Sequence, residues 1–144
     1  MIRKHKRFVK PKKPYESARF KEENVLLENY GLKNKREIWK SIAQLNYFRR
    51  RAKALAKSTR EEQEVFFKKL QALGLKAESI ADVLALSVEN ILGRRFATLV
   101  AKKKLANTVR HARQLIVHKK ILINGKVVNS PGRLITLDEE SSFF

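Results

Sequence analysis

The sequence predicts a mostly helical α+β fold, in which a helical N-terminal lobe precedes a helix–helix–hairpin module. Apolar residues recur at helical spacing in the segments that lead up to the hairpin. Asn124-Gly125 lies between two β-branched runs, which is the strongest short-range signal for a β-hairpin. These patterns divide the chain into a basic arm over 1–14, the lobe over 15–86, the module over 87–137, and a short acidic and aromatic tail over 138–144.

Four helices are expected in the lobe, over 16–30, 34 to about 57, 59–73 and 79–86. The three later helices begin with what resembles a capping box, formed by Asn34 and Glu37, by Thr59 and Glu62, and by Ser79 and Asp82. The first helix has most of its acids in its first half and middle and is the least basic part of the chain, and we therefore expect it to face protein rather than RNA.

The module is expected to contain two helices and a hairpin. Ser87 is a plausible N-cap for the first helix, whose apolar stripe continues as far as Val100. The second helix begins near Asn107 or Thr108, which are both residues that cap helices. A two-residue turn at Asn-Gly would place residue 121 opposite 128 and residue 122 opposite 127.

The charge of the chain points to an anionic partner. The net charge is +19, from 33 basic and 14 acidic residues. No Asp or Glu lies between Glu89 and Asp138, whereas that stretch contains eleven Lys and Arg, and residues 38–60 also lack acids. A folded surface that repels itself in this way needs a polyanion nearby, and nucleic acid is the expected class. The arm carries seven Lys or Arg in 14 residues and is expected to be disordered and to order on binding. A nuclear-import address is a second interpretation of this cluster, and it is compatible with the first.

Other function classes find little support in the residues. There is no Cys, so disulfides and thiolate metal sites are excluded. His111 and His118 could share a helix face, but no nearby acid joins them as a metal ligand. No nucleophile–base pair, P-loop or dinucleotide motif occurs, and we expect neither an enzyme nor a cofactor or small-molecule substrate. No apolar run is long enough to cross a bilayer, so we expect no membrane span. A basic protein of the membrane surface is a third possibility, but the apolar residues are used in packing stripes and no helix pairs a basic face with an exposed apolar one, so we expect no membrane partner.

Several strings in the module resemble a known RNA-binding family. They are Arg94-Arg95-Phe96-x-Thr98-Leu99, Leu105-Ala106-x-Thr108, residues 112–118, Ile121-x-Ile123-Asn124-Gly125-Lys126-x-Val128, and Pro131. Residues 11–15, 30–39 and 82–89 extend the similarity into the arm and the lobe. Together they resemble ribosomal protein S-four of the small subunit, in its archaeal and eukaryotic branch. Trp39, inside the 30–39 string, is expected to pack against Phe20 or Tyr30.

The resemblance implies a structural constituent of the small ribosomal subunit. Such a protein binds a multi-helix junction of small-subunit rRNA early in assembly and lies near the path by which mRNA enters. The implied partners are rRNA, neighbouring small-subunit proteins and mRNA. The implied location is the cytoplasmic ribosome, with nucleolar transit in a eukaryote. The alternative is a ribosome-biogenesis factor, nucleolar and S-four-like, or a ribosome-rescue factor, that binds rRNA transiently.

Polar residues outside the apolar stripes are the candidate RNA contacts. They are Arg49, Arg50, Arg51, Arg94, Arg95, Lys102, Arg110, Arg113, Gln114, His118, Lys119, Lys120, Asn124 and Lys126. Two departures from the resembled family bear on this set. Many relatives have Gly where Lys119 stands, to end the second module helix in a left-handed turn, and a C-terminal extension found in many relatives is short or absent.

Overall fold

The computed structural model describes residues 8–143, so the first seven residues of the predicted arm lie outside the described part. The elements of the lobe are α1 (Ser17–Asn29), α2 (Lys35–Leu55), α3 (Arg60–Ala72) and α4 (Ile80–Ala85). They are followed by α5 (Val88–Gly93), α6 (Phe96–Lys102), α7 (Val109–Val117), β1 (Leu122–Ile123), β2 (Lys126–Val127) and α8 (Leu137–Ser141). The predicted class, α+β and mostly helical, is confirmed. None of the described helices is both long and apolar enough to span a bilayer.

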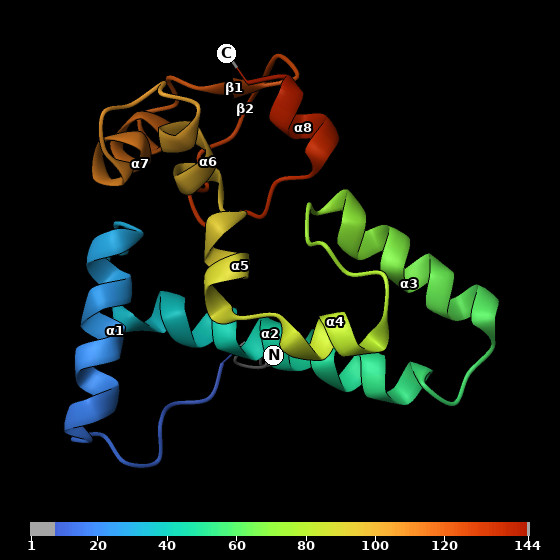
Figure 1. Ribbon diagram of the computed structural model, residues 1–144. Coiled ribbons are helices and arrows are strands. Elements are labelled where there is room, and N and C mark those ends of the chain that lie inside the picture. The colour runs from blue at the N-terminus through green and yellow to red at the C-terminus, as the bar shows by residue number, and fades with distance from the viewer. Residues whose placement is uncertain (1–7, 144) are drawn as a thin grey trace, which may run out of the picture.

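Helix α2 is the element on which the rest of the lobe is assembled. Helices α1, α3, α4 and α5 all contact it, and the elements of the module lie above it in Figure 1, connected through α5. Its buried apolar residues are Ile38, Leu45, Phe48 and Ala52, which lie on the stripe that the sequence predicts. The part of this stripe from Leu45 onward packs against Phe66, Leu70 and other apolar residues to form the core of the lobe.

Helix α1 is attached to α2 largely through a buried carboxylate. Glu23 is 4% exposed and lies within 3.0 Å of the Arg19 guanidinium and 3.2 Å of the Lys35 ammonium. Trp39 Nε1 donates a hydrogen bond of 2.9 Å to the same carboxylate. The Trp39 ring lies 5.9 Å from the Phe8 ring, between centroids. The expected packing against Phe20 or Tyr30 is therefore replaced by a polar contact with Glu23 and an aromatic contact with the arm.

Only one of the three predicted capping boxes forms. Ser79 Oγ accepts a bond from the Asp82 N–H, and the Asp82 carboxylate accepts one from the Ser79 N–H in return. Asn34 and Thr59 occupy N-cap positions, but neither side chain makes a capping bond. The acid expected to complete the first box, Glu37, is bound elsewhere, as described below.

The first helix of the module is broken in two, where the sequence predicts one continuous stripe. Helix α5 ends and α6 begins around Arg94 and Arg95, and Arg95 has an extended backbone with ψ 146. The segment that follows the hairpin crosses here and supplies the missing partners. The Phe96 N–H donates to the Arg133 carbonyl at 2.9 Å, and the Ile135 N–H donates to the Arg94 carbonyl at 3.2 Å. A strand-like contact from a distant segment therefore replaces a helical turn.

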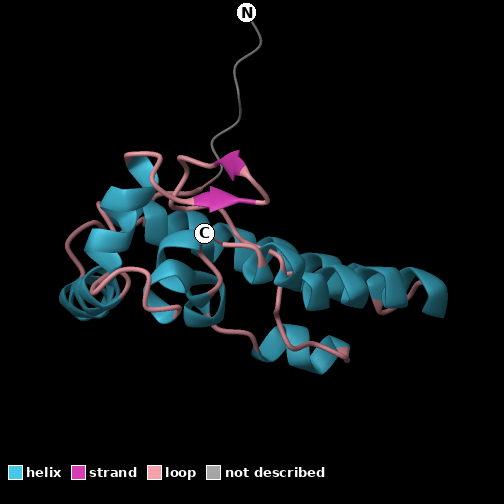
Figure 2. Ribbon diagram, turned by 90° about the horizontal axis from the view of Figure 1, so that it is seen from above, coloured by secondary structure: helices cyan, strands magenta, loops and turns pink. Residues whose placement is uncertain are grey.

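The hairpin has the predicted turn and register. Leu122 pairs with Val127, and Ile123 pairs with Lys126, around the two-residue turn. Asn124 and Gly125 both have positive φ, at 50° and 73°, as a type I′ turn requires. The ladder is shorter than expected, because residues 121 and 128 lie outside the assigned strands. Figure 2 shows the two strands side by side.

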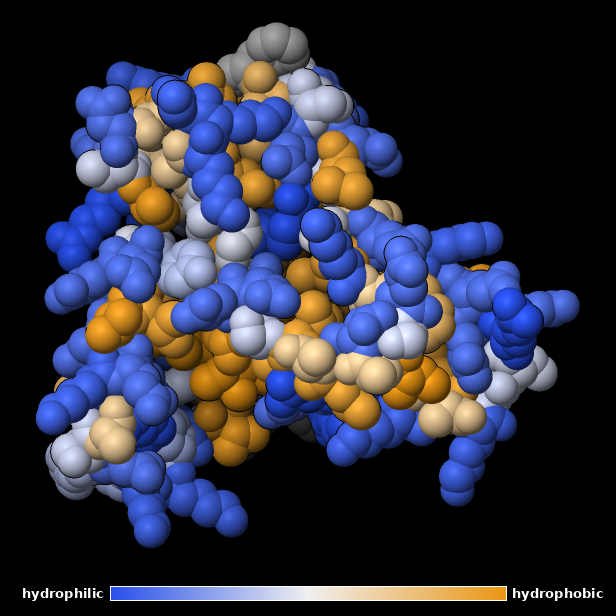
Figure 3. All heavy atoms as spheres, in the orientation of Figure 1, coloured by the Kyte–Doolittle hydropathy of each residue, from blue (hydrophilic) through white to orange (hydrophobic). Residues whose placement is uncertain are grey.

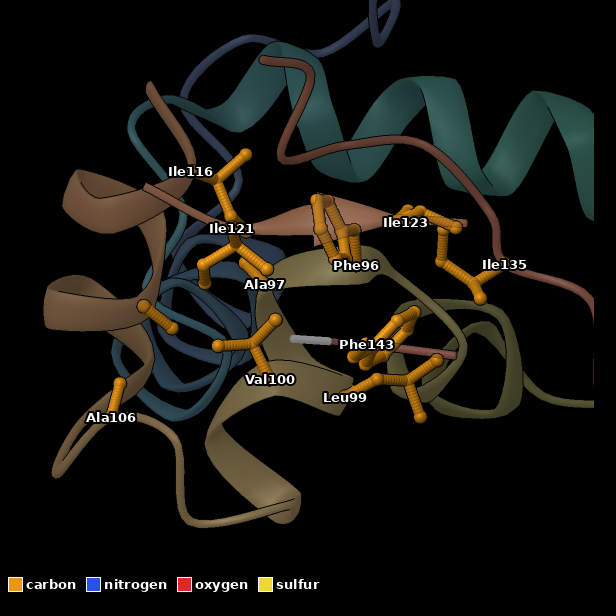
Figure 4. Packing of buried hydrophobic residues seen from close by; sticks show 11 residues of the cluster. Phe96, Ala97, Leu99, Val100, Ala106, Ile116, Ile121, Ile123, Ile135 and Phe143 are labelled. Carbon is orange, nitrogen blue, oxygen red and sulfur yellow. The ribbon is translucent and has the colours of Figure 1, made fainter. Parts of the chain in front are cut away.

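The predicted tail contributes to the core of the module. Thr136 and Glu139 form a full capping box at the start of α8, and Phe143 behind it is 7% exposed. Phe143 meets Phe96 edge to face, with ring centroids 5.3 Å apart. Figure 4 shows these rings within one cluster with apolar residues of α6, α7 and the hairpin. The cluster runs from Phe96 to Phe143, whereas Val88 and Ile91 pack with the lobe.

Candidate nucleic-acid interface

The exposed face of α7 presents polar side chains in a fixed spacing. Thr108 caps the helix, because its hydroxyl accepts a bond of 3.1 Å from the His111 N–H. Ala112 and Ile116 anchor the opposite face in the core. Arg110, Gln114 and His118 are consequently turned to solvent, each four residues from the next. Around the later part of this face, a hollow of about 210 Å³ is lined by His111, Gln114, Leu115, His118 and Lys120.

Ten of the fourteen candidate contacts are exposed and have no partner of their own. They are Arg50, Arg51, Lys102, Arg110, Gln114, His118, Lys119, Lys120, Asn124 and Lys126. Within residues 8–143, none of their side chains takes part in an ion pair or a side-chain hydrogen bond. Figure 3 shows hydrophilic side chains projecting over much of one face of the molecule. These groups are free to bind an anion without first breaking an internal contact.

A cleft of about 920 Å³ lies between α2 and the segment that follows the hairpin. Its lining includes five basic side chains, Lys40, Arg50, Arg95, Arg113 and Arg133. Glu37 is the one acid among its lining residues. Tyr47, which is 50% exposed, and Phe8 add aromatic surface. Basic groups beside an exposed aromatic ring suit a phosphate with an unstacked base.

Two of the candidate arginines form ion pairs with Glu37 inside the protein. Arg113 binds the Glu37 carboxylate with both guanidinium nitrogens, at 2.8 Å and 3.1 Å. Arg95 donates to the same carboxylate from Nη2, and Arg95 is 6% exposed. Burial raises the pKa of Glu37, but the hydrogen bonds and positive charges of Arg113 and Arg95 outweigh it and lower the pKa to about 2. This contact joins α2 of the lobe to α6 and α7 of the module.

Two further candidate arginines hold backbone segments in place. Arg49 Nη2 donates a bond of 2.7 Å to the Leu86 carbonyl, at the end of α4. Arg94 donates to the Ile135 carbonyl at 3.1 Å and lies 2.7 Å from the Glu140 carboxylate of α8. The remaining members of the Arg49–Arg51 run point to solvent, so the run both covers the edge of the core and presents free charge.

Comparison with known proteins places this chain in a family. Residues 94–141 match the S4 domain. A small ribosomal subunit protein uS4 of Ignicoccus hospitalis is 43% identical over 94% of this chain and 85% of its own length. A protein of the same name from Thermoplasma volcanium is 42% identical over 96% of this chain and 74% of its own length. Another from Methanothermobacter thermautotrophicus is 39% identical over 94% of this chain and 82% of its own length. The chain belongs to the uS4 family.

The matched region of this uS4 chain coincides closely with one buried cluster. The S4 domain match begins at Arg94, where α5 gives way to α6, and ends at Ser141 in α8. The cluster centred on Phe96 spans nearly the same residues. The division predicted between residues 86 and 87 remains an expectation. The recognition of an S-four family member of the archaeal type is confirmed.

Sequence reasoning left out several residues that line the cleft of this uS4 chain. Lys40, Tyr47 and Arg133 line it but were not among the predicted contacts. Lys40, Tyr47 and Arg50 are seven and three residues apart, so their spacing on α2 is a signal that could have revealed a common face. Arg133 has no comparable signal, because its place depends on how the segment after the hairpin crosses α6. Within residues 8–143, no cluster of three or more His, Asp or Glu side chains could hold a metal.

Proposed function

We propose that this protein is a structural constituent of the small ribosomal subunit that binds small-subunit rRNA. The observation that carries the proposal is its similarity to proteins named small ribosomal subunit protein uS4 over 94–96% of its length. The net charge of +19 and the acid-free stretches of α2 and of the module support the same conclusion. The protein acts as a scaffold for RNA and performs no chemical step.

Binding is electrostatic and shape-selective. Seven of the ten unpartnered side chains are Lys or Arg, and these neutralise phosphates and release condensed counterions, which supplies most of the affinity. Helices α6 and α7 fix the spacing of these groups, because their buried faces share one core. A rigid set of charges selects RNA whose backbone follows the same path, so folded RNA is recognised more than base sequence. The cleft beside Tyr47 accepts an unpaired nucleotide.

The finer role follows from the family resemblance. The protein binds a multi-helix junction early in assembly and lies near the path by which mRNA enters the subunit. Basic residues bind rRNA, while the exposed acids of α1, Glu22 and Glu28, suit contact with a neighbouring protein. Arg49, Arg94, Arg95 and Arg113 act in the first place as internal supports, since each has a partner within the protein.

Sedimentation separates this role from transient binding. Small subunits are washed in high salt, and the copies of this protein per subunit are counted in mature particles and in precursors. A constituent stays at close to one copy per mature subunit. A biogenesis or rescue factor would be found on precursors or stalled particles only, and that distribution would refute the proposal. Hydroxyl-radical footprinting of small-subunit rRNA then locates the junction.

A further inference from the structure

Four helices of this protein end in the same hydrogen-bonded motif. In each, the N–H of the second residue after the helix donates to the carbonyl three residues earlier, and the N–H of the following residue donates to the carbonyl five residues earlier. This pair of bonds defines a Schellman motif. The bonds are Gly31 to Glu28 and Leu32 to Leu27 after α1, Gly74 to Gln71 and Leu75 to Leu70 after α3, Lys104 to Ala101 and Leu105 to Val100 after α6, and Lys119 to Ile116 and Lys120 to Leu115 after α7. The motif requires a left-handed residue at the first of these two positions.

The lobe and the module fill that position differently. The lobe uses Gly31 and Gly74, with φ of 56° and 72°. The module uses Lys104 and Lys119, with φ of 59° and 60°. Glycine adopts this region freely, whereas the β-carbon of lysine crowds the backbone there. Both helices that carry the candidate interface therefore end in a strained lysine, whereas the other two Schellman motifs, after α1 and α3, use glycine.

Neither lysine gains a compensating contact within the described chain. Both are exposed, and over residues 8–143 neither side chain makes an ion pair or a hydrogen bond. Their neighbours add repulsion, because Lys102 and Lys103 precede Lys104, and Lys120 follows Lys119. Lys103 differs from them, since its ammonium lies 4.5 Å from the centre of the Phe143 ring. A residue held in an unfavourable conformation without an internal partner points to a role outside the protein.

The two lysines bracket the exposed face of α7. Lys104 lies in the loop that leads into α7, and Lys119 lies just past its end. Helices α6 and α7 make the most extensive pairing of elements in the described structure, so the positions of both lysines are fixed by one packed unit. A helix of nine residues is roughly 14 Å long, which sets the scale of the separation.

We propose that Lys104 and Lys119 are phosphate-binding residues, kept in the left-handed conformation because it directs their ammonium groups toward RNA on either side of α7. This inference rests on the proposed function and adds to it. Lys104 is added to the candidate contacts, among which it was not counted. For Lys119, phosphate binding explains why a strained lysine stands where many relatives have glycine. The protein loses stability in the free state at these two positions and recovers it when RNA is bound.

The test replaces each lysine with glycine in the full chain. Thermal unfolding of Lys104→Gly and Lys119→Gly is measured without RNA, and binding to transcribed small-subunit rRNA of Ignicoccus hospitalis is measured over a series of salt concentrations. Each variant should melt about 2–5 °C higher than the parent protein. Each should bind the rRNA more weakly, with a plot of log K against log salt that is shallower by about 0.7 to 0.9.

Three further variants separate strain from charge. Lys120→Gly removes an adjacent positive charge at a residue without positive φ, and its melting temperature should not rise. Lys119→Asn keeps a residue that tolerates the left-handed region but removes the charge, and it should bind as weakly as Lys119→Gly. Lys119→Arg keeps the charge and should bind nearly as well as the parent.

The outcomes distinguish this inference from the proposed function. A lower melting temperature in both glycine variants would show that the lysines stabilise the free protein, for example through the helix dipole, and would overturn the inference. Glycine variants that are stabilised but bind rRNA with unchanged affinity and salt dependence would also overturn it. In both cases, a parent protein that binds rRNA with steep salt dependence leaves the proposed function intact.

Discussion

The Glu37 carboxylate is bound by two guanidinium groups from the module, and it is the main polar contact between the two halves of the molecule. Neither arginine can be recognised as a partner of Glu37 from the sequence, because they lie 58 and 76 residues further along the chain. The acid-free character of the module made both arginines candidate RNA contacts. The fold brings in the missing acid from α2, which also explains why Glu37 does not complete a capping box with Asn34.

Replacing Glu37 by Gln should destabilise the protein strongly. Arg95 is nearly buried, and removal of its counter-charge leaves two guanidinium groups facing a neutral amide. We expect the free energy of unfolding, measured with urea, to fall by about 3 kcal/mol. Glu61→Gln, at an exposed site without an ion pair among the described residues, is the matched control and should change it by less than about 0.5 kcal/mol. Equal stability of the two variants would contradict this account of the contact.

The same carboxylate predicts how stability depends on pH. The pKa of Glu37 falls from 4.5 to about 2 on folding, so its contribution is complete above pH 4.5 and is lost as pH falls toward 2. The shift corresponds to roughly 3 kcal/mol. The difference in unfolding free energy between the parent protein and Glu37→Gln, measured with urea at several pH values, should therefore be constant from pH 7 to 5. Below pH 5 this difference should become smaller. A difference that persists at pH 2 would show that the ionised carboxylate is not its source.

Among the secondary elements, the hairpin was the easiest to predict and the α5–α6 break the hardest. The Asn-Gly turn is specified by the backbone preferences of its two residues, so the turn type and the register of the two strands follow from those residues alone. The break at Arg94 and Arg95 interrupts an apolar stripe that continues in helical phase on both sides. The break exists because Arg133 and Ile135 supply backbone hydrogen-bond partners. A local sequence pattern cannot predict a contact with a segment so distant in the chain. Helix α8 was missed for a related reason, since Phe143 is buried by residues that lie far from it in the sequence, Phe96 among them.

A β-branched residue at the turn should disrupt the hairpin. A β-carbon at Gly125 would meet no atom within 4 Å, so the cost of Gly125→Val arises from its φ of 73° alone. We expect a loss of about 1–2 kcal/mol in the free energy of unfolding and weaker cross-strand NOEs between β1 and β2. Gly93→Ala, at the end of α5 without positive φ, is the control and should be neutral or stabilising. An unchanged hairpin in Gly125→Val would remove the turn assignment.

Truncating Phe143 tests whether the last helix belongs to the module core. The ring is 7% exposed and packs edge to face on Phe96, so Phe143→Ala should cost about 3 kcal/mol of unfolding free energy. Leu137→Ala removes an apolar side chain of α8 itself, but one that is 51% exposed, and it should cost less than about 0.5 kcal/mol. If both variants unfold at the same urea concentration, the packing of α8 contributes nothing to stability.

Taken as a whole, the molecule is a strongly cationic surface supported by two apolar cores joined at α2 and α5. Apolar spacing and the Asn-Gly turn were enough to predict the fold class, and the charge pattern was enough to predict a polyanionic partner. They did not separate the arginines that support the fold from the side chains that remain free. That distinction depends on which carbonyl or carboxylate lies beside each guanidinium, and therefore on the tertiary structure.

Affinity for rRNA should depend steeply on salt. If about eight phosphates are neutralised, log K should fall against log salt with a slope of about −6 to −7, because each contact contributes 0.7 to 0.9. Replacing Arg50 and Arg51 by Ala should make that slope shallower by about 1.5. Replacing Lys68 and Lys69, which lie toward the end of α3 and are not candidate contacts, removes the same charge and should change the slope less. A parent slope shallower than about −2 in a filter-binding assay would contradict the proposed binding mode.

The contact made by Glu37 also limits how freely the S4 domain of this chain can be recombined with other proteins. A fragment confined to residues 94–141 contains Arg95 and Arg113 but leaves their carboxylate behind on α2. Grafted onto a foreign host, it would introduce an uncompensated pair of cations unless the host offered an acid at the corresponding place. Chimeras that carry α2 together with the domain should therefore be easier to produce in soluble, folded form than the domain alone.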